Sequence, residues 1–274
     1  IVKLFTQEPM NPFIFSGMPH LVSLNVLTLY PTELVALFLP VSPSTFYAFD
    51  LLLHLFLAAA AMRWWLRRQG VTEGGAFTGG LVYALGGHCL TLAAAGHPHW
   101  VRCLALMPLC FAALEGFPAR GAVSGALAGL VISVALLGAS LHFVILAVPV
   151  GVIWIVATGT APLREKAVRI FCFGAVPLVL GAVIWIPGFE YFLESVRRVP
   201  AAGAGTSWAL SVWDLPALLV PGLWGTPEAY WGPHLFRASG DYPGLLAVAL
   251  AAIGLAARWR SEMRFAVLGT AGIL

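Results

Sequence analysis

The chain is built from long apolar stretches separated by short polar turns, without the regular alternation of apolar and polar residues that marks a membrane-spanning β-strand. Most of these stretches approach the ~20 residues that a helix needs to cross the ~30 Å hydrocarbon core of a bilayer. The pattern therefore predicts an all-α fold, a polytopic transmembrane helical bundle. The expected spans are residues 45–65, 75–95, 100–114, 122–138, 141–157, 170–187 and 242–257, and Ser42, Pro43 and Ser44 are expected to form the helix start before the first of them.

Residues 11–31 interrupt this pattern before the first clear span. They read NPFIFSGMPHLVSLNVLTLYP, and their Asn-Pro, Ser-Gly and Met-Pro pairs break a continuous spanning helix. Such a segment can form a re-entrant or amphipathic outer loop that lies over a cavity. We expect it to form the floor or the lid of a site at one membrane face.

The spans organise the chain as one transmembrane domain. Its expected parts are residues 1–44 as an outer loop with short interfacial segments, 45–187 as a six-helix core, 188–241 as a long outer loop and 242–274 as further helices. No signal-peptide pattern stands at the start, and the last residues lie inside an apolar run. We therefore expect residues 1–274 to be an internal fragment of a longer protein.

Composition and charge agree with a membrane protein. The chain is 60% hydrophobic and 10% charged, and its net charge of +3 is too small to indicate nucleic-acid binding. Ten of the 15 Lys and Arg residues lie in loops on one side of the predicted zigzag, which the positive-inside rule assigns to the cytoplasm. Residues 11–31 and 188–241 then lie on the outer side, together with most of the histidines.

Asp50 and His54 are one helical turn apart in the first clear span, so they project from the same face. A carboxylate inside a membrane helix is costly, and it normally faces a cavity or a partner. One interpretation is a site carboxylate that is oriented by the histidine. The other is a buried hydrogen-bonded pair that locks helices together.

The predicted outer turn GHPHW holds His97 and His99. A mononuclear metal site would need a third ligand from elsewhere in the chain, such as His20, Glu8 or Asp241. The two histidines are also consistent with contacts to a polar substrate and, more simply, with a position in the membrane interface. The sequence therefore assigns no metal ligands, and it leaves a divalent metal cofactor open without requiring one.

The predicted outer loop 188–241 carries Arg197 and Arg198 beside Ser195, and several aromatic residues that include Tyr230. Aromatic rings stack on sugars and Arg side chains bind phosphates, so this composition suits a pocket for a phosphorylated sugar or a lipid headgroup. An aromatic belt with contacts to membrane lipids would explain the same residues without a substrate.

Several short motifs follow one another across nearly the whole chain: NPFIFSGMP, the pair Tyr30 and Pro31, LHLFLAAAAMRWWLRRQG, GGHCLTLAAAGHPHWVRCLALMPL, LLGASLH, SVRRV, VPGLWG, YWG and YPGLLAVALAAIGL. In this order and spacing they resemble the YfhO-type family of bacterial polytopic membrane proteins. That family is similar to the GT-C class of integral-membrane glycosyltransferases. The resemblance implies a GT-C-like bundle in the bacterial cytoplasmic (inner) membrane, with its main loops on the extracytoplasmic side.

The resemblance also implies an activity, the transfer of a sugar from a polyprenyl-phosphate donor to a glycan or lipid acceptor. A carboxylate would deprotonate the acceptor hydroxyl, while Arg and His side chains would stabilise the departing polyprenyl phosphate. The family's acidic motif precedes the NPxxFSGxP stretch, so we expect it upstream of Ile1. Within the chain, the catalytic candidates are Asp50 and Glu8, although Glu8 does not match the family's acidic position. The implied pocket residues are Asn11, Ser16, Tyr30, His54, His97, Arg197 and Tyr230.

A second hypothesis is a structural one. The chain could be a non-catalytic subunit that uses a GT-C-like bundle to hold lipids or other membrane subunits in a larger complex. Stretches such as GALAGLVISVALLGAS are rich in small residues and permit close helix packing, within the protein or with partners.

Overall fold

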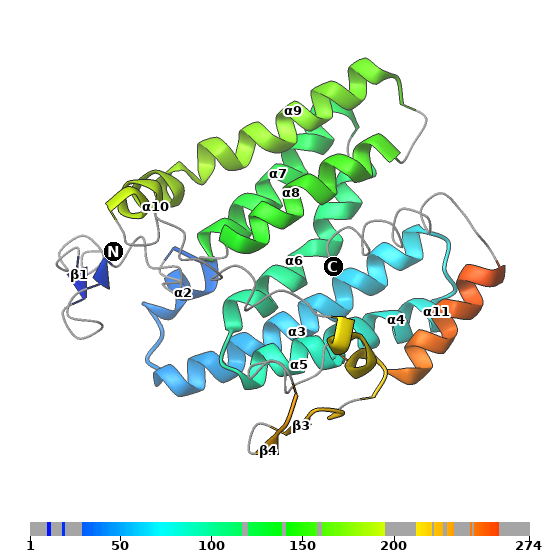
Figure 1. Ribbon diagram of the computed structural model, residues 1–274. Coiled ribbons are helices and arrows are strands. Elements are labelled where there is room, and N and C mark those ends of the chain that lie inside the picture. The colour runs from blue at the N-terminus through cyan, green and yellow to red at the C-terminus, as the bar shows by residue number, and fades with distance from the viewer. Residues whose placement is uncertain are drawn as a thin grey trace.

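The protein is mostly helical in the computed structural model (Figure 1). The structure describes residues 10–11, 18–19, 29–116, 120–138, 141–157, 161–194, 212–220, 222–226, 229–232, 242 and 244–257. The α-helices are α2 (Pro31–Ala36), α3 (Pro43–Arg68), α4 (Glu73–Leu85), α5 (Gly87–Ala94), α6 (Pro98–Leu114), α7 (Gly121–Leu137), α8 (Leu141–Ala157), α9 (Leu163–Leu180), α10 (Ala182–Glu194) and α11 (Leu245–Ala257). A 3₁₀ helix covers Val212–Leu218. Two short antiparallel hairpins pair β1 (Met10–Asn11) with β2 (Met18–Pro19) and β3 (Gly225–Thr226) with β4 (Ala229–Tyr230).

Local sequence signals explain where the first long helices begin and end. The Ser42 hydroxyl accepts a hydrogen bond from the Thr45 N–H at 3.2 Å, and Pro43 follows in the first turn, as expected for a helix start. Gly70 after α3 and Gly96 after α5 adopt φ values of 80° and 74°, the left-handed conformation that commonly ends a helix. The predicted start of the first span is therefore confirmed.

Membrane-spanning character is clearest in two stretches. Pro43–Arg68 and Glu73–Ala94 are long and apolar enough to cross a bilayer, and the pair α9 and α10 would be a third if this bent pair forms one span. Helices α6, α7 and α8 are also apolar but shorter. The exposed aromatic residues Phe49, Phe56 and Phe171 are 68–73% accessible, which suits contact with lipid.

Several predicted spans match the observed helices, and one does not. Residues 141–157 form α8 over the predicted range, and α7 differs from its prediction by one residue at each end. The span predicted over 75–95 corresponds to Glu73–Ala94, which is long enough to cross a bilayer, with an interruption at Gly86, whose backbone is extended. The boundaries predicted for 170–187 are wrong because α9 begins at Leu163 and the chain bends by 71° before α10.

The predicted outer loop 188–241 also begins differently from the prediction, because α10 continues as far as Glu194. Its sequence lacks a strong helix breaker between Gly188 and Glu194, and the run FEYFLE extends the apolar pattern with two carboxylates on one face. Further along, this region contains the 3₁₀ helix and the β3–β4 hairpin. The region is therefore partly regular rather than a continuous loop.

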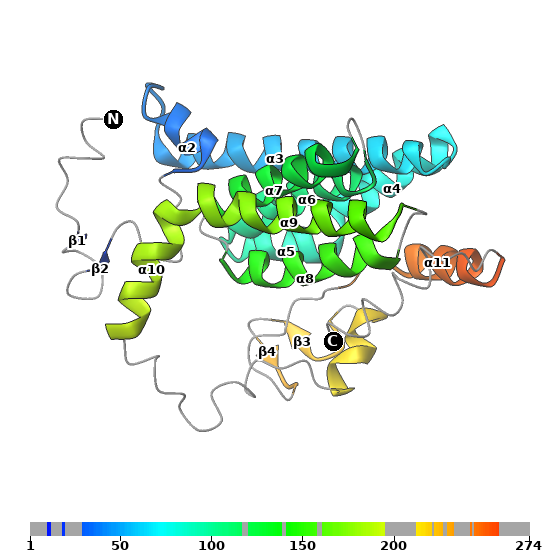
Figure 2. The same cartoon turned by 90° about the horizontal axis from the view of Figure 1, so that it is seen from above.

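Helix α7 packs closely along α9 through its small residues. Gly125 lies against the Arg169 carbonyl, and Gly129 lies against the Phe173 carbonyl. The same offset of 44 positions at both contacts means that the two helices run in the same direction. The predicted zigzag, with one helix between them, requires this direction (Figures 1 and 2). The small residues of α7 therefore serve packing inside this chain.

The main apolar core lies where α6, α7, α8 and α9 meet. Its most buried members include Leu114, Ile132, Ile155 and Phe173, one from each of these helices. Dispersion contacts between such closely packed side chains, rather than the hydrophobic effect, hold helices together in a lipid environment. This core keeps α6 in place, and α6 carries residues of the candidate site described below.

The turns predicted for the cytoplasmic side meet at one end of the bundle. The Glu115 carboxylate accepts hydrogen bonds from the Trp65 indole and the Gln69 amide, which joins the α6–α7 turn to the α3–α4 turn. Arg169 donates to the Leu114 carbonyl at 2.8 Å, which adds the start of α9. The start of α3 and the α5–α6 turn lie at the opposite end (Figure 1).

Candidate functional site

A buried ionic cluster joins α2, α3 and α6 near the end opposite the basic turns. Arg102 of α6 is 1% exposed, and its Nε donates to Oδ2 of Asp50 of α3 at 2.8 Å. Its Nη2 donates to Oε1 of Glu33 of α2, also at 2.8 Å. Because a lone charge is costly in a bilayer, each of these groups depends on its partners. The cluster therefore fixes α2 against the two longer helices.

His54 and Tyr30 extend the cluster on one side. His54 Nδ1 lies 2.7 Å from the Asp50 main-chain carbonyl, which can only accept, so Nδ1 carries the proton of the neutral imidazole. Its Nε2 then accepts from the Tyr30 hydroxyl at 2.9 Å. Burial raises the pKa of Tyr30, against the opposing effect of Arg102, so the hydroxyl keeps the proton that it donates.

The cluster is rich in negative charge and incompletely hydrogen-bonded. Two carboxylates, those of Glu33 and Asp50, face one guanidinium, which also lies 4.7 Å from the centre of the Tyr30 ring. Among the described residues, Oδ1 of Asp50 and Nη1 of Arg102 have no hydrogen-bond partner. Because its Nε and Nη2 are already held by carboxylates, Arg102 is poorly suited to bind a phosphate.

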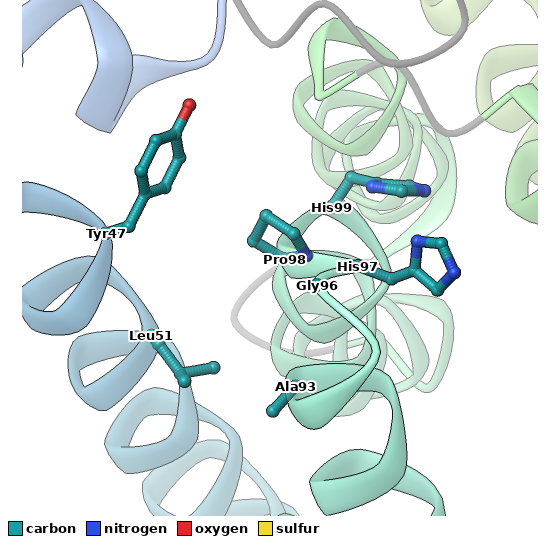
Figure 3. A pocket seen from close by; sticks show the side chains of 7 residues that line it. All are labelled: Tyr47, Leu51, Ala93, Gly96, His97, Pro98 and His99. Atoms are coloured by element: carbon teal, nitrogen blue, oxygen red, sulfur yellow. The ribbon is translucent and has the colours of Figure 1, made fainter. Parts of the chain in front are cut away.

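A pocket lies next to this cluster, between α3 and the α5–α6 turn. Its volume is about 540 Å³, and its lining residues are Tyr47, Leu51, Ala93, Gly96, His97, Pro98 and His99. In Figure 3, Tyr47 and Leu51 project from α3 on one side of the pocket, and Pro98 and Ala93 stand on the other. The imidazoles of His97 and His99 point away from α3 in this view, and their ring centres are 5.5 Å apart.

The pocket and the cluster are neighbours along two helices. Tyr47 precedes Asp50 by three residues on α3, and His99 precedes Arg102 by three residues on α6, so each pair shares a helix face. A pocket lined by Tyr47 and two histidines therefore lies beside the carboxylates of Glu33 and Asp50, near one end of the bundle.

The structure brings some of the predicted site residues together and separates others. Tyr30, Asp50 and His54 meet in the cluster, in agreement with a buried hydrogen-bonded group, and His97 lines the adjacent pocket. Tyr230 belongs to the β3–β4 hairpin and is not among the residues that line the pocket. The remaining predictions fall on Asn11, of which only the strand β1 backbone is described, and on Glu8, Ser16 and Arg197, which lie outside the described residues.

Sequence reasoning missed three residues that complete the site: Glu33, Tyr47 and Arg102. Arg102 gave the clearest missed signal, because an Arg within an apolar helix requires an acidic partner and Asp50 lies near the same end of its own helix. Glu33 gave no comparable signal, since it stands in a short segment that looked merely interfacial.

The described residues do not include a group of three or more His, Cys, Asp or Glu side chains that could hold a metal ion. The imidazoles of His97 and His99 are close to each other, but among the described residues they are not joined by a third His, Cys, Asp or Glu that could complete a metal site. The site offers instead hydroxyl, imidazole and carboxylate groups. Comparisons with protein-family models, with curated proteins and with solved structures gave no match.

Proposed function

We propose that the chain is part of a GT-C-like membrane glycosyltransferase that uses a polyprenyl-phosphate-linked sugar on the extracytoplasmic face of the bacterial inner membrane. The observation that carries the proposal is the pocket beside the Glu33–Arg102–Asp50 cluster. Its place near the end opposite the basic turns, and the resemblance to the YfhO-type family, support the same activity.

The size and the lining of the pocket suit a sugar. A volume of about 540 Å³ lies within the usual range of small-molecule sites. Tyr47 offers an aromatic face for stacking on a sugar ring, and its hydroxyl can form a hydrogen bond with a sugar hydroxyl. The lipid tail of the donor would remain in the bilayer, where the outer surfaces of α3 and its neighbours are apolar.

Glu33 is the best general base among the described carboxylates. Its side chain is 16% exposed, whereas that of Asp50 is 1% exposed. Glu33 would take the proton of the acceptor hydroxyl as the acceptor oxygen attacks the anomeric carbon. The bond between that carbon and the phosphate oxygen would break on the opposite side, so the polyprenyl phosphate departs with the electron pair and the anomeric centre inverts.

Filling the pocket tests this proposal. Leu51→Trp places a large ring in the pocket, and Leu52→Trp places the same ring on the neighbouring position, which is 62% exposed and faces away. Sugar transfer from a labelled polyprenyl-phosphate donor would be measured in membranes that contain the full-length protein. We expect Leu51→Trp to lose most of the transfer and Leu52→Trp to retain it. Equal activity of the two variants would refute the pocket assignment.

A structural subunit is the second candidate function, and one observation favours it. Arg102 is fully engaged at Nε and Nη2 by two carboxylates from different helices, as in a cluster that only locks a fold. Under this hypothesis the intact protein lacks transferase activity and purifies stably with other membrane subunits. Leu51→Trp would then change neither its abundance nor its partners.

A further inference from the structure

The bend at Gly181 lies level with the end of α7. A side chain at Gly181 would collide with the Leu136 side chain, and Leu136 is the penultimate residue of α7. Gly125 of α7 contacts α9 at Arg169 and Gly129 contacts it at Phe173, so successive contacts along α7 approach the bend. Helix α10 therefore begins at the depth where the neighbouring helix α7 ends, and this is the end of the bundle that holds the candidate site.

Helix α10 is too short to cross the membrane alone, because its 13 residues measure about 20 Å and the hydrocarbon core measures ~30 Å. Helix α9 already covers most of the core, since its 18 residues measure about 27 Å. The chain turns by 71° between α9 and α10, so α10 lies closer to the membrane plane than to the membrane normal if α9 stands upright (Figure 2). The Trp185 indole donates to the Leu178 carbonyl at 2.7 Å and thereby satisfies an acceptor near the bend.

Three aromatic side chains of α10 share one face, and its two carboxylates lie on the opposite face, with Tyr191 beside Glu194. Phe189 and Phe192 have ring centres 6.5 Å apart, and at 100° per residue Trp185 falls on the same side of the helix. Glu190 and Glu194 are one turn apart on the other side. None of the residues of α10 is buried among the described parts of the chain, and Phe189 is 58% exposed.

We propose that α10 is an interfacial helix whose aromatic face, formed by Trp185, Phe189 and Phe192, inserts into the headgroup and upper acyl region of the outer leaflet. The occupant of this face is the lipid surface itself. A short helix at the membrane boundary with aromatic residues on one side and carboxylates on the other has the composition of such elements. The proposal concerns lipid contact and does not depend on sugar transfer.

Spin-label depth measurements test the proposal in the full-length protein, reconstituted in phosphatidylethanolamine–phosphatidylglycerol nanodiscs. Single labels at Phe189→Cys and Glu194→Cys would be compared with one at Phe171→Cys, in a background without the native cysteines. Phe171 is 73% exposed and lies midway along α9, so it is the matched control for deep lipid contact. Relative collision rates with oxygen and with a water-soluble nickel chelate give the depth of each label.

We expect the Phe189 label to contact lipid roughly 10 Å closer to the membrane surface than the Phe171 label. The Glu194 label should be the most accessible to the nickel chelate. A Phe189 label as deep as the Phe171 label would show that α10 continues the span, and a Phe189 label shielded from both reagents would show that protein covers this face. Either result overturns the proposal.

Discussion

At the scale of single residues, Arg102 is the group on which the cluster depends most. Arg102→Met would leave Asp50 and Glu33 without their cation in a buried site, which typically costs about 3–5 kcal/mol. We expect the variant to unfold well below the wild-type temperature in detergent. Adding Asp50→Asn should recover part of this loss, because it removes one of the uncompensated carboxylates.

The matched comparison is Arg102→Met against Arg102→Met combined with Asp50→Asn, with thermal unfolding followed by circular dichroism. If the second substitution lowers the stability further, the two side chains act independently and the ion pair is not the source of the stability. Asp50→Asn alone should be milder than Arg102→Met, since Arg102 retains Glu33.

The Tyr83 hydroxyl replaces a backbone hydrogen bond that Pro108 cannot make in α6. Pro108 lies inside α6 and has no N–H for the carbonyl of Leu104 four residues earlier, and the Tyr83 hydroxyl donates to that carbonyl at 2.7 Å. Tyr83→Phe should therefore cost about 1 kcal/mol of stability. In a Pro108→Ala background the cost should be smaller, because the new N–H at position 108 can bind the carbonyl. A double-mutant cycle of unfolding free energies measures the difference, and equal costs in the two backgrounds would contradict this role for Tyr83.

At the scale of elements, the contact between α7 and α9 allows a test with a built-in control. A Cβ at Gly129 would lie 2.9 Å from both the Phe173 carbonyl oxygen and Val176, whereas a Cβ at Gly174 would meet nothing within 4 Å. We expect Gly129→Ala to destabilise the bundle by about 1–3 kcal/mol through forced separation of the helices. Gly174→Ala should be neutral or stabilising, because Ala favours the helix. Similar unfolding temperatures for the two variants would mean that this contact is not tight.

The helices that could be predicted from the sequence are those whose signals are local. The Ser42–Pro43 start of α3 and the apolar run of α8 lie in the residues themselves, and the structure has them where they were expected. The bend after Leu180 could not be predicted, because the apolar pattern runs through Gly181 without interruption. Its position is associated with a tertiary contact, the close packing of Gly181 on Leu136 of α7.

At the scale of the whole molecule, part of the candidate site followed from the sequence. Asp50 and His54 share a turn of one helix, so their proximity was local and predictable. The contacts of Asp50 with Arg102 and of Arg102 with Glu33 join residues 52 and 69 positions apart, and they depend on how three helices cross. The sequence does not show which helices pack together, so the meeting of two carboxylates with one guanidinium could not be predicted from it.

The arrangement of the two bundle ends leads to the last prediction. Leu39 lies before α3 at the end with the cluster and is 47% exposed, whereas Leu163 begins α9 at the basic end and is 83% exposed. The positive-inside rule assigns the basic end to the cytoplasm. In intact cells, a membrane-impermeant maleimide should therefore label Leu39→Cys and spare Leu163→Cys, each in a background without the native cysteines.

Permeabilised cells provide the control, since both cysteines should then react to the same extent. Labelling of Leu163→Cys alone in intact cells would mean that the bundle is inserted in the opposite direction, which would place the pocket on the cytoplasmic side, away from an extracytoplasmic sugar acceptor. Labelling of both would mean that the two ends do not lie on opposite sides of the membrane. Helix α3 joins the two ends with about 39 Å of continuous helix, a length that exceeds the hydrocarbon core, so the two ends should lie on opposite sides of the membrane. With the basic end in the cytoplasm, we expect labelling of Leu39→Cys alone in intact cells.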